Sequence, residues 1–214
     1  MTRTASQTEM LDRLQRDSFR YFWDQANPDN GLVFDNTRQT SSCSIAAVGL
    51  ALACYPVAAE RGFVTRAEAA LRTRTTLRTF RDGEQSERPD AMGYRGFYYH
   101  FLDMETGRRA MKSELSSVDS GFLFAGMLAA ALYFDADDPV EREVRETADA
   151  LYRRADWRWM QNGGPTLTHG WRPGRGFLPY RWQGYDEALL LYFLALGSPT
   201  HPLPAESYAA WLSS

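Results

Sequence analysis

Seven carboxylates stand in stretches without helical periodicity or just before apolar runs. They are Asp35, Asp103, Glu105, Glu114, Asp119, Asp186 and Glu187. Cleaving a glycosidic bond takes two carboxyl groups, one protonated to expel the leaving group and one ionised to activate water or to attack. Asp119 and Glu187 each stand at the start of an apolar run, so helices that gather their first turns together would bring these two acids to one place.

Aromatic and guanidinium side chains accompany these acids in the same segments. Flat rings cover the C–H faces of a sugar, and charged groups bond its hydroxyls, so the combination suits a carbohydrate. The candidate catalytic residues are Glu187, Asp119, Glu114 and Asp103. The candidate substrate-binding residues are Tyr94, Tyr99, His100, Arg95, Trp171, Arg181, Trp182, Tyr185 and Asp186.

Each of these candidates also has a purely structural interpretation. Acidic residues are favoured in a first helical turn, where free N–H groups and the helix dipole attract anions, so Glu187 and Asp186 can be simple caps. Ser116 and Asp119 have the spacing of a capping box. A histidine such as His100, in an alternating aromatic segment, is more often a satisfied, partly buried side chain than a catalyst. The aromatic residues can equally pack between loops.

Two kinds of helix alternate along the chain, which indicates how the acids are positioned. Amphipathic patterns predict helices at 9–25, 65–81 and 139–152, whereas runs that are apolar on every side predict helices at 44–57, 119–134 and from 187 onward. A last short helix is predicted at 205–212. A helix apolar all round must be covered all round, so the pattern favours inner helices shielded by outer ones, as in an α/α toroid.

The segments between these helices are long, and they hold most of the candidate residues. We expect irregular loops at 27–43, 82–118 and 157–184, with a short β element near Phe97–Asp103, where alternate residues are aromatic. If the inner helices run parallel, these loops and the helix N-termini meet at one rim. Loops carried on a rigid scaffold commonly hold functional residues.

Composition narrows the class of protein. The 214 residues carry a net charge of −3 with a pI near 5.7, which gives no electrostatic reason to expect nucleic acid or an acidic membrane surface. No apolar run reaches the roughly 18 residues of a membrane span. The N-terminus lacks the apolar core of a signal peptide, so we expect a cytoplasmic chain, or a periplasmic or secreted one that has lost a leader. No cofactor or metal is expected, and Cys43 and Cys54 are predicted to be packing residues.

Several longer segments identify a resemblance. The stretches YFWDQANPDNGLV, GFYYHFLDMETGRR, ELSSVDSG and GFLPYRWQGYDEALLLYFLALGSPTHP resemble the glycoamylase-like domain. That family includes the endo-β-1,2-glucanases of glycoside hydrolase family 144, and similar domains occur in cyclic β-1,2-glucan synthases. The resemblance covers about Phe19 to Trp211. It implies an (α/α)6 toroid of bacterial origin that acts on β-1,2-linked glucan without a metal.

The resemblance also ranks the acids. Glu187 in GYDEA matches a GYNEA-type motif and becomes the first catalytic candidate, and Asp103, Glu114 and Asp119 fall on other acidic motifs of the family. The chain departs from the pattern at Asp186, where Asn is commoner, and at Ser120, where Thr is usual. We expect Glu187 to be the functional acid, buried enough to hold a proton, and Asp186 to support it.

Length suggests that the toroid is incomplete. Twelve helices with ordinary loops need on the order of 350–400 residues, and this chain has room for about seven helices. We therefore expect one domain over 1–214 that forms the N-terminal half of a toroid, with a C-terminal half or a second chain completing it. The predicted activity is that of an inverting glycoside hydrolase on β-1,2-glucan. The alternatives are a non-catalytic glycan-binding or scaffold module, part of a larger glucan-processing enzyme, and a helical-repeat interaction protein.

Overall fold

Helices make up most of the molecule, which is a computed structural model that describes residues 4–38 and 40–213. They are α1 (Ala5–Asp24), α2 (Ile45–Glu60), α3 (Arg66–Asp82), α4 (Ser117–Tyr133), α5 (Pro139–Arg154), α6 (Trp157–Gln161), α7 (Leu189–Leu196) and α8 (Glu206–Leu212). All seven predicted helices are present, with ends shifted by a few residues. The short helix α6 lies where only a loop was predicted.

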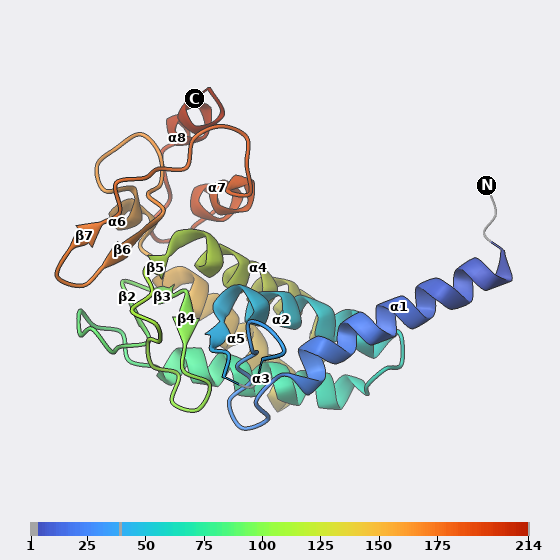
Figure 1. Cartoon of the computed structure of the whole chain (residues 1–214). Helices are drawn as coiled ribbons and strands as arrows, with labels where there is room; N and C mark the ends of the chain where they lie inside the picture. The colour runs from blue at the N-terminus through green and yellow to red at the C-terminus, as the bar shows by residue number, and fades with distance from the viewer. Residues whose placement is uncertain (1–3, 39, 214) are drawn as a thin grey trace.

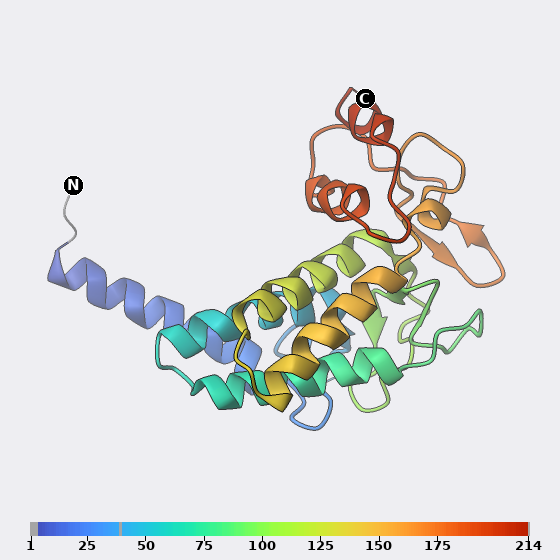
Figure 2. The ribbon, with the colours of Figure 1, turned by 180° about the vertical axis from the view of Figure 1, so that it is seen from behind.

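The apolar helices α2 and α4 lie side by side in the middle of the helical layer, with α3 and α5 on one side of them (Figures 1 and 2). Two glycines allow the close approach. A Cβ at Gly126 would lie 1.9 Å from the carbonyl oxygen of Gly49, and one at Gly49 would lie 2.3 Å from that of Phe122. Helix α7 packs against α4 as well.

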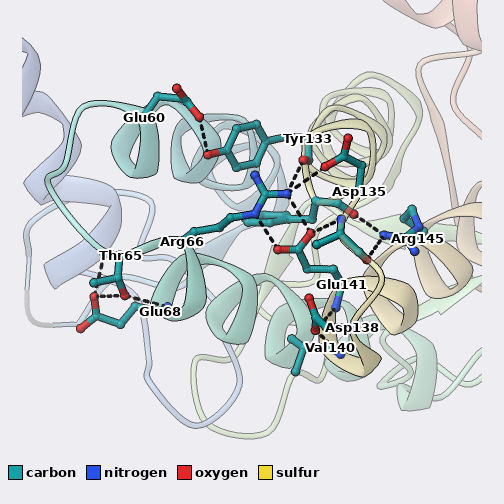
Figure 3. Close-up of polar contacts among 12 residues, drawn as sticks. Glu60, Thr65, Arg66, Glu68, Tyr133, Asp135, Asp138, Val140, Glu141 and Arg145 are labelled. Atoms are coloured by element: carbon teal, nitrogen blue, oxygen red, sulfur yellow. Dashed lines mark hydrogen bonds and ion pairs between the residues drawn. The ribbon is translucent and has the colours of Figure 1, made fainter.

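A buried ion pair joins the outer helices to the end of α4 (Figure 3). Arg66, at the start of α3, bonds Glu141 of α5 through Nε at 2.7 Å, and also donates to the carbonyl of Tyr133 at 2.9 Å. Glu141 is only 4% exposed, and its second oxygen accepts the N–H of Ala136 at 2.7 Å. The hydrogen bond from Arg66 lowers the pKa of Glu141, although burial opposes this. The charge is therefore fully partnered, as burial requires.

The β structure is larger than the single short element predicted. A five-stranded antiparallel sheet has the order β2-β3-β5-β6-β7, and β1 pairs with β4 in a two-stranded sheet. The predicted segment supplies β3 and β4, interrupted at His100. The strands are β1 (Cys43–Ser44), β2 (Gly93–Tyr94), β3 (Phe97–Tyr99), β4 (Phe101–Leu102), β5 (Leu115–Ser116), β6 (Gly170–Arg172) and β7 (Gly176–Phe177).

Backbone bonds bring the starts of the inner helices to this β structure. The N–H of Ile45, the first residue of α2, donates to the carbonyl of His100 at 3.2 Å. The N–H of Ser117, the first residue of α4, donates to the carbonyl of His169 at 3.1 Å. The loop before α7 is tied in as well, because Trp182 Nε1 donates to Ser117 Oγ at 2.9 Å. The rim is therefore made of sheet as well as loops.

The inner helices leave large apolar side chains uncovered. Leu50 and Val57 of α2 are 47% and 44% exposed, Leu132 of α4 is 83% exposed, and Phe193 of α7 is 66% exposed. Burying such side chains is worth about 1.5–3 kcal/mol each, so their exposure leaves a substantial favourable free energy unused. The expectation that inner helices of this chain alone are incompletely covered agrees with these exposures.

Helix α1 packs along only part of its length, although its amphipathic pattern predicted an apolar face throughout. Its last turns, with Phe19, Phe22 and Trp23, contact the core. Its first half extends away from the other helices (Figure 1), and Met10 and Leu14 are 52% and 60% exposed. Among the described helices, none combines the length and the apolar character that a membrane crossing requires. Cys43 and Cys54 are both free thiols, as expected.

Candidate active site

Three of the predicted residues meet at the β rim of the inner helices. His100 Nδ1 lies 3.0 Å from Glu114 Oε1 and 3.6 Å from Asp119 Oδ2. One ligand-type atom from each of the three side chains lies within 4.8 Å of the others. All three are partly buried, so the cluster is neither fully exposed nor enclosed in the core.

The fold fixes each member of this His100–Glu114–Asp119 cluster. His100 sits between β3 and β4, stacked on Phe101 with ring centroids 3.9 Å apart, and its N–H donates to the carbonyl of Glu114 at 3.0 Å. Asp119 stands in the first turn of α4. Ser116, the N-cap, accepts the Asp119 N–H at 3.2 Å and donates its hydroxyl to Asp119 Oδ2 at 2.5 Å. Ser116 therefore caps α4, and its hydroxyl holds the Asp119 carboxyl beside His100. The Asp119 carboxyl bonds this hydroxyl and not the Ser116 backbone N–H, so the full capping box expected from the spacing is not formed.

The cluster separates the proton affinities of its two acids. The hydrogen bond with His100 lowers the pKa of Glu114 to about 2, against the opposing effect of burial. Burial raises the pKa of Asp119, despite the hydrogen bond from Ser116 and the charge of His100. Burial alone would lower the pKa of His100, but the hydrogen bond with Glu114 and the charges of both acids raise it overall. Neighbouring acids with opposite shifts are typical of proton donor and ionised partner in a hydrolase.

The same residues are also a conceivable metal site, since one imidazole and two carboxylates are within reach of one ion. Their present partners argue against it. Arg172 Nη2 approaches Glu114 Oε2 at 3.5 Å, and the Ser116 hydroxyl already bonds the Asp119 oxygen nearest His100. A cation would have to compete with the guanidinium for Glu114. The arrangement suits acid–base chemistry better, and the expectation that no metal is needed stays a prediction.

Glu187 and Asp186 lie before α7 and not inside it. The helix begins at Leu189 and not at 187, and Ala188 is its N-cap. Asp186 Oδ1 accepts the Ala188 N–H at 2.9 Å and the Trp211 Nε1–H at 3.1 Å, so it fixes this turn. Glu187 is exposed, so the expected burial of its carboxyl beside Tyr185 was wrong: the turn points it outward.

His169 connects these two acids to the start of α4. Its ring is stacked on Trp182 with centroids 4.0 Å apart, and its carbonyl caps α4 through Ser117. Burial lowers the pKa of His169, while the charges of Asp186 and Glu187 act in the opposite direction. Both acids are therefore close enough to act electrostatically on a residue that contacts the first turn of α4.

Asp103, the fourth catalytic candidate, is occupied by its own turn. Its Oδ1 accepts the backbone N–H groups of Glu105 and Thr106 and the hydroxyl of Thr106 at 3.2, 2.8 and 2.7 Å. These bonds lower the pKa of Asp103. It does not belong to the cluster around His100. A carboxylate with this role stabilises the loop that precedes β5.

Three of the aromatic candidates are packing residues in this structure. Tyr99, Trp171 and Trp182 are 0%, 9% and 8% exposed. The guanidinium carbon of Arg109 lies 4.5 Å from the ring centroid of Tyr99. The ring centroids of Trp171 and Tyr94 lie 5.2 Å apart. Their packing between loops agrees with the alternative interpretation of these rings.

The remaining candidates divide between structural contacts and exposure. Arg181 donates to the carbonyls of Gln161 and Thr166, and so ties its loop to the end of α6. Arg95 lies 3.7 Å from Asp156. Tyr185 is 75% exposed beside Glu187 and is the aromatic candidate most accessible to a ligand.

Arg172 was not among the predicted site residues. It lies in the sequence segment from which the candidates were drawn, but its contact with Glu114 depends on the pairing of β5 with β6. That pairing joins segments more than fifty residues apart, and no local pattern indicates it.

Comparison with known proteins relates this chain to a family of sequences and to solved folds. Residues 179–214 match the family model Glycoamylase, described as "Putative glucoamylase". An exo-β-1,2-glucooligosaccharide sophorohydrolase (non-reducing end) of Parabacteroides distasonis is 27% identical over 215 residues, covering 96% of this chain and 29% of the relative. The resemblance to the glycoamylase-like family is thus confirmed.

Solved structures agree with the sequence comparison. A "putative glucoamylase" from Bacteroides uniformis superposes with a TM-score of 0.87 at 28% identity, covering 100% of this chain and 52% of that one. A β-1,2-glucanase from Parabacteroides distasonis gives 0.88 at 26% identity, covering 100% of this chain and 30% of that one. The chain therefore spans about half, or less, of the length of these proteins. Its relatives include β-1,2-glucan hydrolases from bacteria.

Proposed function

We propose that this chain is the acid-bearing part of a glycoside hydrolase that acts on β-1,2-linked glucan. The observation that carries the proposal is the opposite shift of the pKa values of Asp119 and Glu114 around His100. The similarity to β-1,2-glucan hydrolases at modest identity supports the substrate class. Arg172 beside the cluster can bind sugar hydroxyls, and the exposed Tyr185 beside Glu187 offers a ring face.

The structure suggests which residue serves each step of the reaction. Asp119 is the proton donor in this proposal, since burial raises its pKa and so favours the protonated form, and the Ser116 bond at the start of α4 holds it in place. Glu187, exposed at the start of α7, is the carboxylate that activates water from the other side of the sugar. Glu114 stays ionised and orients His100. Asp119 lies in the first turn of α4 and Glu187 in the turn before α7. We propose that a water molecule is activated between the sugar and Glu187, which makes the reaction inverting.

Two substitutions separate these roles. Asp119→Asn removes the donor, so the rate of cleavage of β-1,2-gluco-oligosaccharides should fall roughly 10²–10⁴-fold. An aryl sophoroside should be cleaved nearly as fast as by the wild type, because its good leaving group needs no proton. Glu187→Gln should impair both substrates, and added azide should restore turnover of the aryl substrate. Proton NMR of the first product should show the α-anomer. A first product with the β-anomer would contradict inversion, and an aryl substrate equally impaired by Asp119→Asn would contradict the donor role.

A covering partner follows from the exposed apolar side chains of α2, α4 and α7. We propose that further helices, in a second segment or a second chain, pack on Leu50, Val57, Leu132 and Phe193 and complete a toroid. The solved structures that contain this fold are longer than the chain by about a factor of two or more, which supports the proposal. The 214 residues alone should self-associate in sedimentation or bind a hydrophobic dye. A dye-silent monomer would refute a half-toroid.

The longer relatives also keep a second candidate function open, that of one part of a larger glucan-processing enzyme. In that case the 214 residues bind β-1,2-gluco-oligosaccharide, and catalysis requires the covering helices. Binding by calorimetry together with the absence of reducing-end release favours this function.

A further inference from the structure

A hollow beside the candidate active site is lined mainly by cations. It has a volume of about 470 Å³ and is bounded by Pro89, Asp90, Arg109, Lys112, Arg172, Pro173 and Arg175. Four of these seven residues carry a positive charge and one a negative charge, in a protein whose net charge is −3. The single acid is already neutralised, because Asp90 pairs with Arg88 and with Arg108. Over the residues that the structure describes, Arg172 alone of the four cations approaches a carboxylate, that of Glu114, so the lining keeps an excess of positive charge.

Arg109 is held in place by carbonyl groups that do not cancel its charge. Arg109 donates to the backbone carbonyls of Ser113, Pro89 and Lys112 at 2.6, 3.2 and 2.9 Å. Burial and the neighbouring charge of Arg172 both lower the pKa of Arg109, which shows how closely the two cations are placed. Keeping like charges together costs free energy unless an anion joins them.

Arg172 links this hollow to the acidic cluster. Its Nη2 lies 3.5 Å from Glu114, while its buried Nε lacks a hydrogen-bond acceptor within the described part of the chain. An unpartnered buried N–H is costly and is commonly satisfied by a ligand or water. A group bound by Arg172 would therefore lie directly beside Glu114.

The two exposed cations are presented by unusual backbone. Met111 and Lys112 have consecutive φ values of 55° and 52°, in the left-handed region that residues with a Cβ rarely adopt. Arg175 lies between Gly174 and Gly176, whose φ values of 70° and 79° form the tight β6–β7 turn. Within residues 4–38 and 40–213, neither Lys112 nor Arg175 forms an ion pair. Strained backbone of this kind clusters at ligand sites.

We propose that this cationic hollow is a subsite for an oxyanion carried on the sugar chain, a carboxylate or a phosphate ester. Arg109 and Arg172 form its floor, and Lys112 and Arg175 close over the anion. Because the hollow lies beside Glu114, a substituted sugar bound there would lie next to the proposed catalytic residues. The choice of β-1,2-glucan as the sugar chain rests on the proposed function. The preferred substrate is then an acidic, substituted β-1,2-glucan.

Lys112 offers a direct probe, because it is the only lysine in the chain. Reductive ¹³C-methylation keeps its charge and gives one lysine methyl signal in an NMR spectrum of the whole 214-residue chain. The probes are four: unsubstituted β-1,2-gluco-oligosaccharide, the same sugar with a succinyl half ester, the same sugar with a phosphate ester, and inorganic phosphate alone. The two substituted sugars distinguish carboxylate from phosphate as the preferred group.

We expect at least one substituted sugar to shift the Lys112 signal at concentrations where the unsubstituted sugar does not. Arg175→Gln should weaken that binding about 3–10-fold, the size expected for one partly exposed charge contact. The matched control Arg20→Gln, on the protruding helix α1, should leave it unchanged. Added salt should weaken binding of the substituted sugar more than that of the neutral one.

Failure of this inference differs from failure of the proposed function. If neither substituted sugar shifts the signal, or if the unsubstituted sugar shifts it equally, the anion subsite is refuted even when glucan is cleaved. If inorganic phosphate shifts the signal as strongly as either substituted sugar, the site holds free anions, and the claim for a substituted glucan is refuted. If a substituted sugar shifts the signal but no glucan is hydrolysed, the subsite stands and the hydrolase assignment fails.

Discussion

Replacing His100 should raise the pKa of Glu114 and change how stability depends on pH. In the wild-type chain the hydrogen bond and charge of His100 help to take the pKa of Glu114 from an ordinary 4.5 to about 2. At 1.36 kcal/mol for each pKa unit, that difference corresponds to at most about 3 kcal/mol of interaction. His100→Leu removes both the bond and the charge, whereas His100→Gln can keep a hydrogen bond to Glu114 without the charge.

The sign of the effect follows from the two shifts. Glu114 has a depressed pKa, so its contribution to stability is present above about 4.5 and is lost as the pH falls toward about 2. His100 has a raised pKa, so its contribution is fully present below 6.5 and is lost as the pH rises through the raised value. Both describe one interaction, so the loss caused by His100→Leu should be largest between about pH 4.5 and 6.5.

Urea unfolding at a series of pH values measures this directly. We expect the free energy of unfolding of His100→Leu to fall below that of the wild type by about 1–3 kcal/mol inside that window and by less on either side. His100→Gln should lose less. A deficit that stays constant from pH 3 to pH 9 would refute the charge coupling and leave only packing as the role of His100.

Five further substitutions test the packing, the ion pair of Arg66 with Glu141 and the acids before α7. Gly126→Ala should reduce the free energy of unfolding by about 1–3 kcal/mol or more, because the new Cβ meets the backbone of α2. Gly121→Ala should cost less, because its Cβ meets a leucine side chain that can move, and equal losses in thermal melts of the two variants would contradict this explanation. Glu141→Gln should lower the free energy of unfolding by about 1–3 kcal/mol at neutral pH. The difference from the wild type should shrink as the pH falls through the depressed pKa of Glu141, and a difference that grows toward low pH would contradict this sign. Glu187→Gln should reduce kcat/KM on β-1,2-glucan about 10²–10⁴-fold and Asp186→Asn far less, so equal damage in steady-state kinetics would contradict the division of roles.

Sequence patterns gave most of the helices because their causes are local. Helix α3 begins with a capping box of Thr65 and Glu68, and the apolar runs become the helices α2, α4 and α7. The limits of the method appear where a residue's role depends on the sheet. β6 lies in a segment expected to be irregular, and its pairing with β5 decides that Arg172 reaches Glu114.

The candidate site was predicted only in part for the same reason. Asp119 and Glu114 share a short stretch of sequence, so their proximity could be anticipated, and their contact with His100 comes from the neighbouring strands. The burial expected for Glu187 failed because the helix begins two residues later than its apolar run suggests, which leaves that acid in a turn. Side-chain direction in a turn depends on dihedral angles that composition does not determine.

The central claim, that these acids serve the hydrolysis of β-1,2-glucan, is tested most directly by reducing-end release from the linear polymer. The purified chain should release reducing ends from β-1,2-glucan and not from β-1,3- or β-1,4-glucan, and calorimetry should show binding of the same polymer to Glu187→Gln. Binding by the wild-type chain without any release would assign the site to a glycan-binding module or to one part of a larger enzyme. Neither release nor binding of β-1,2-glucan would contradict the account.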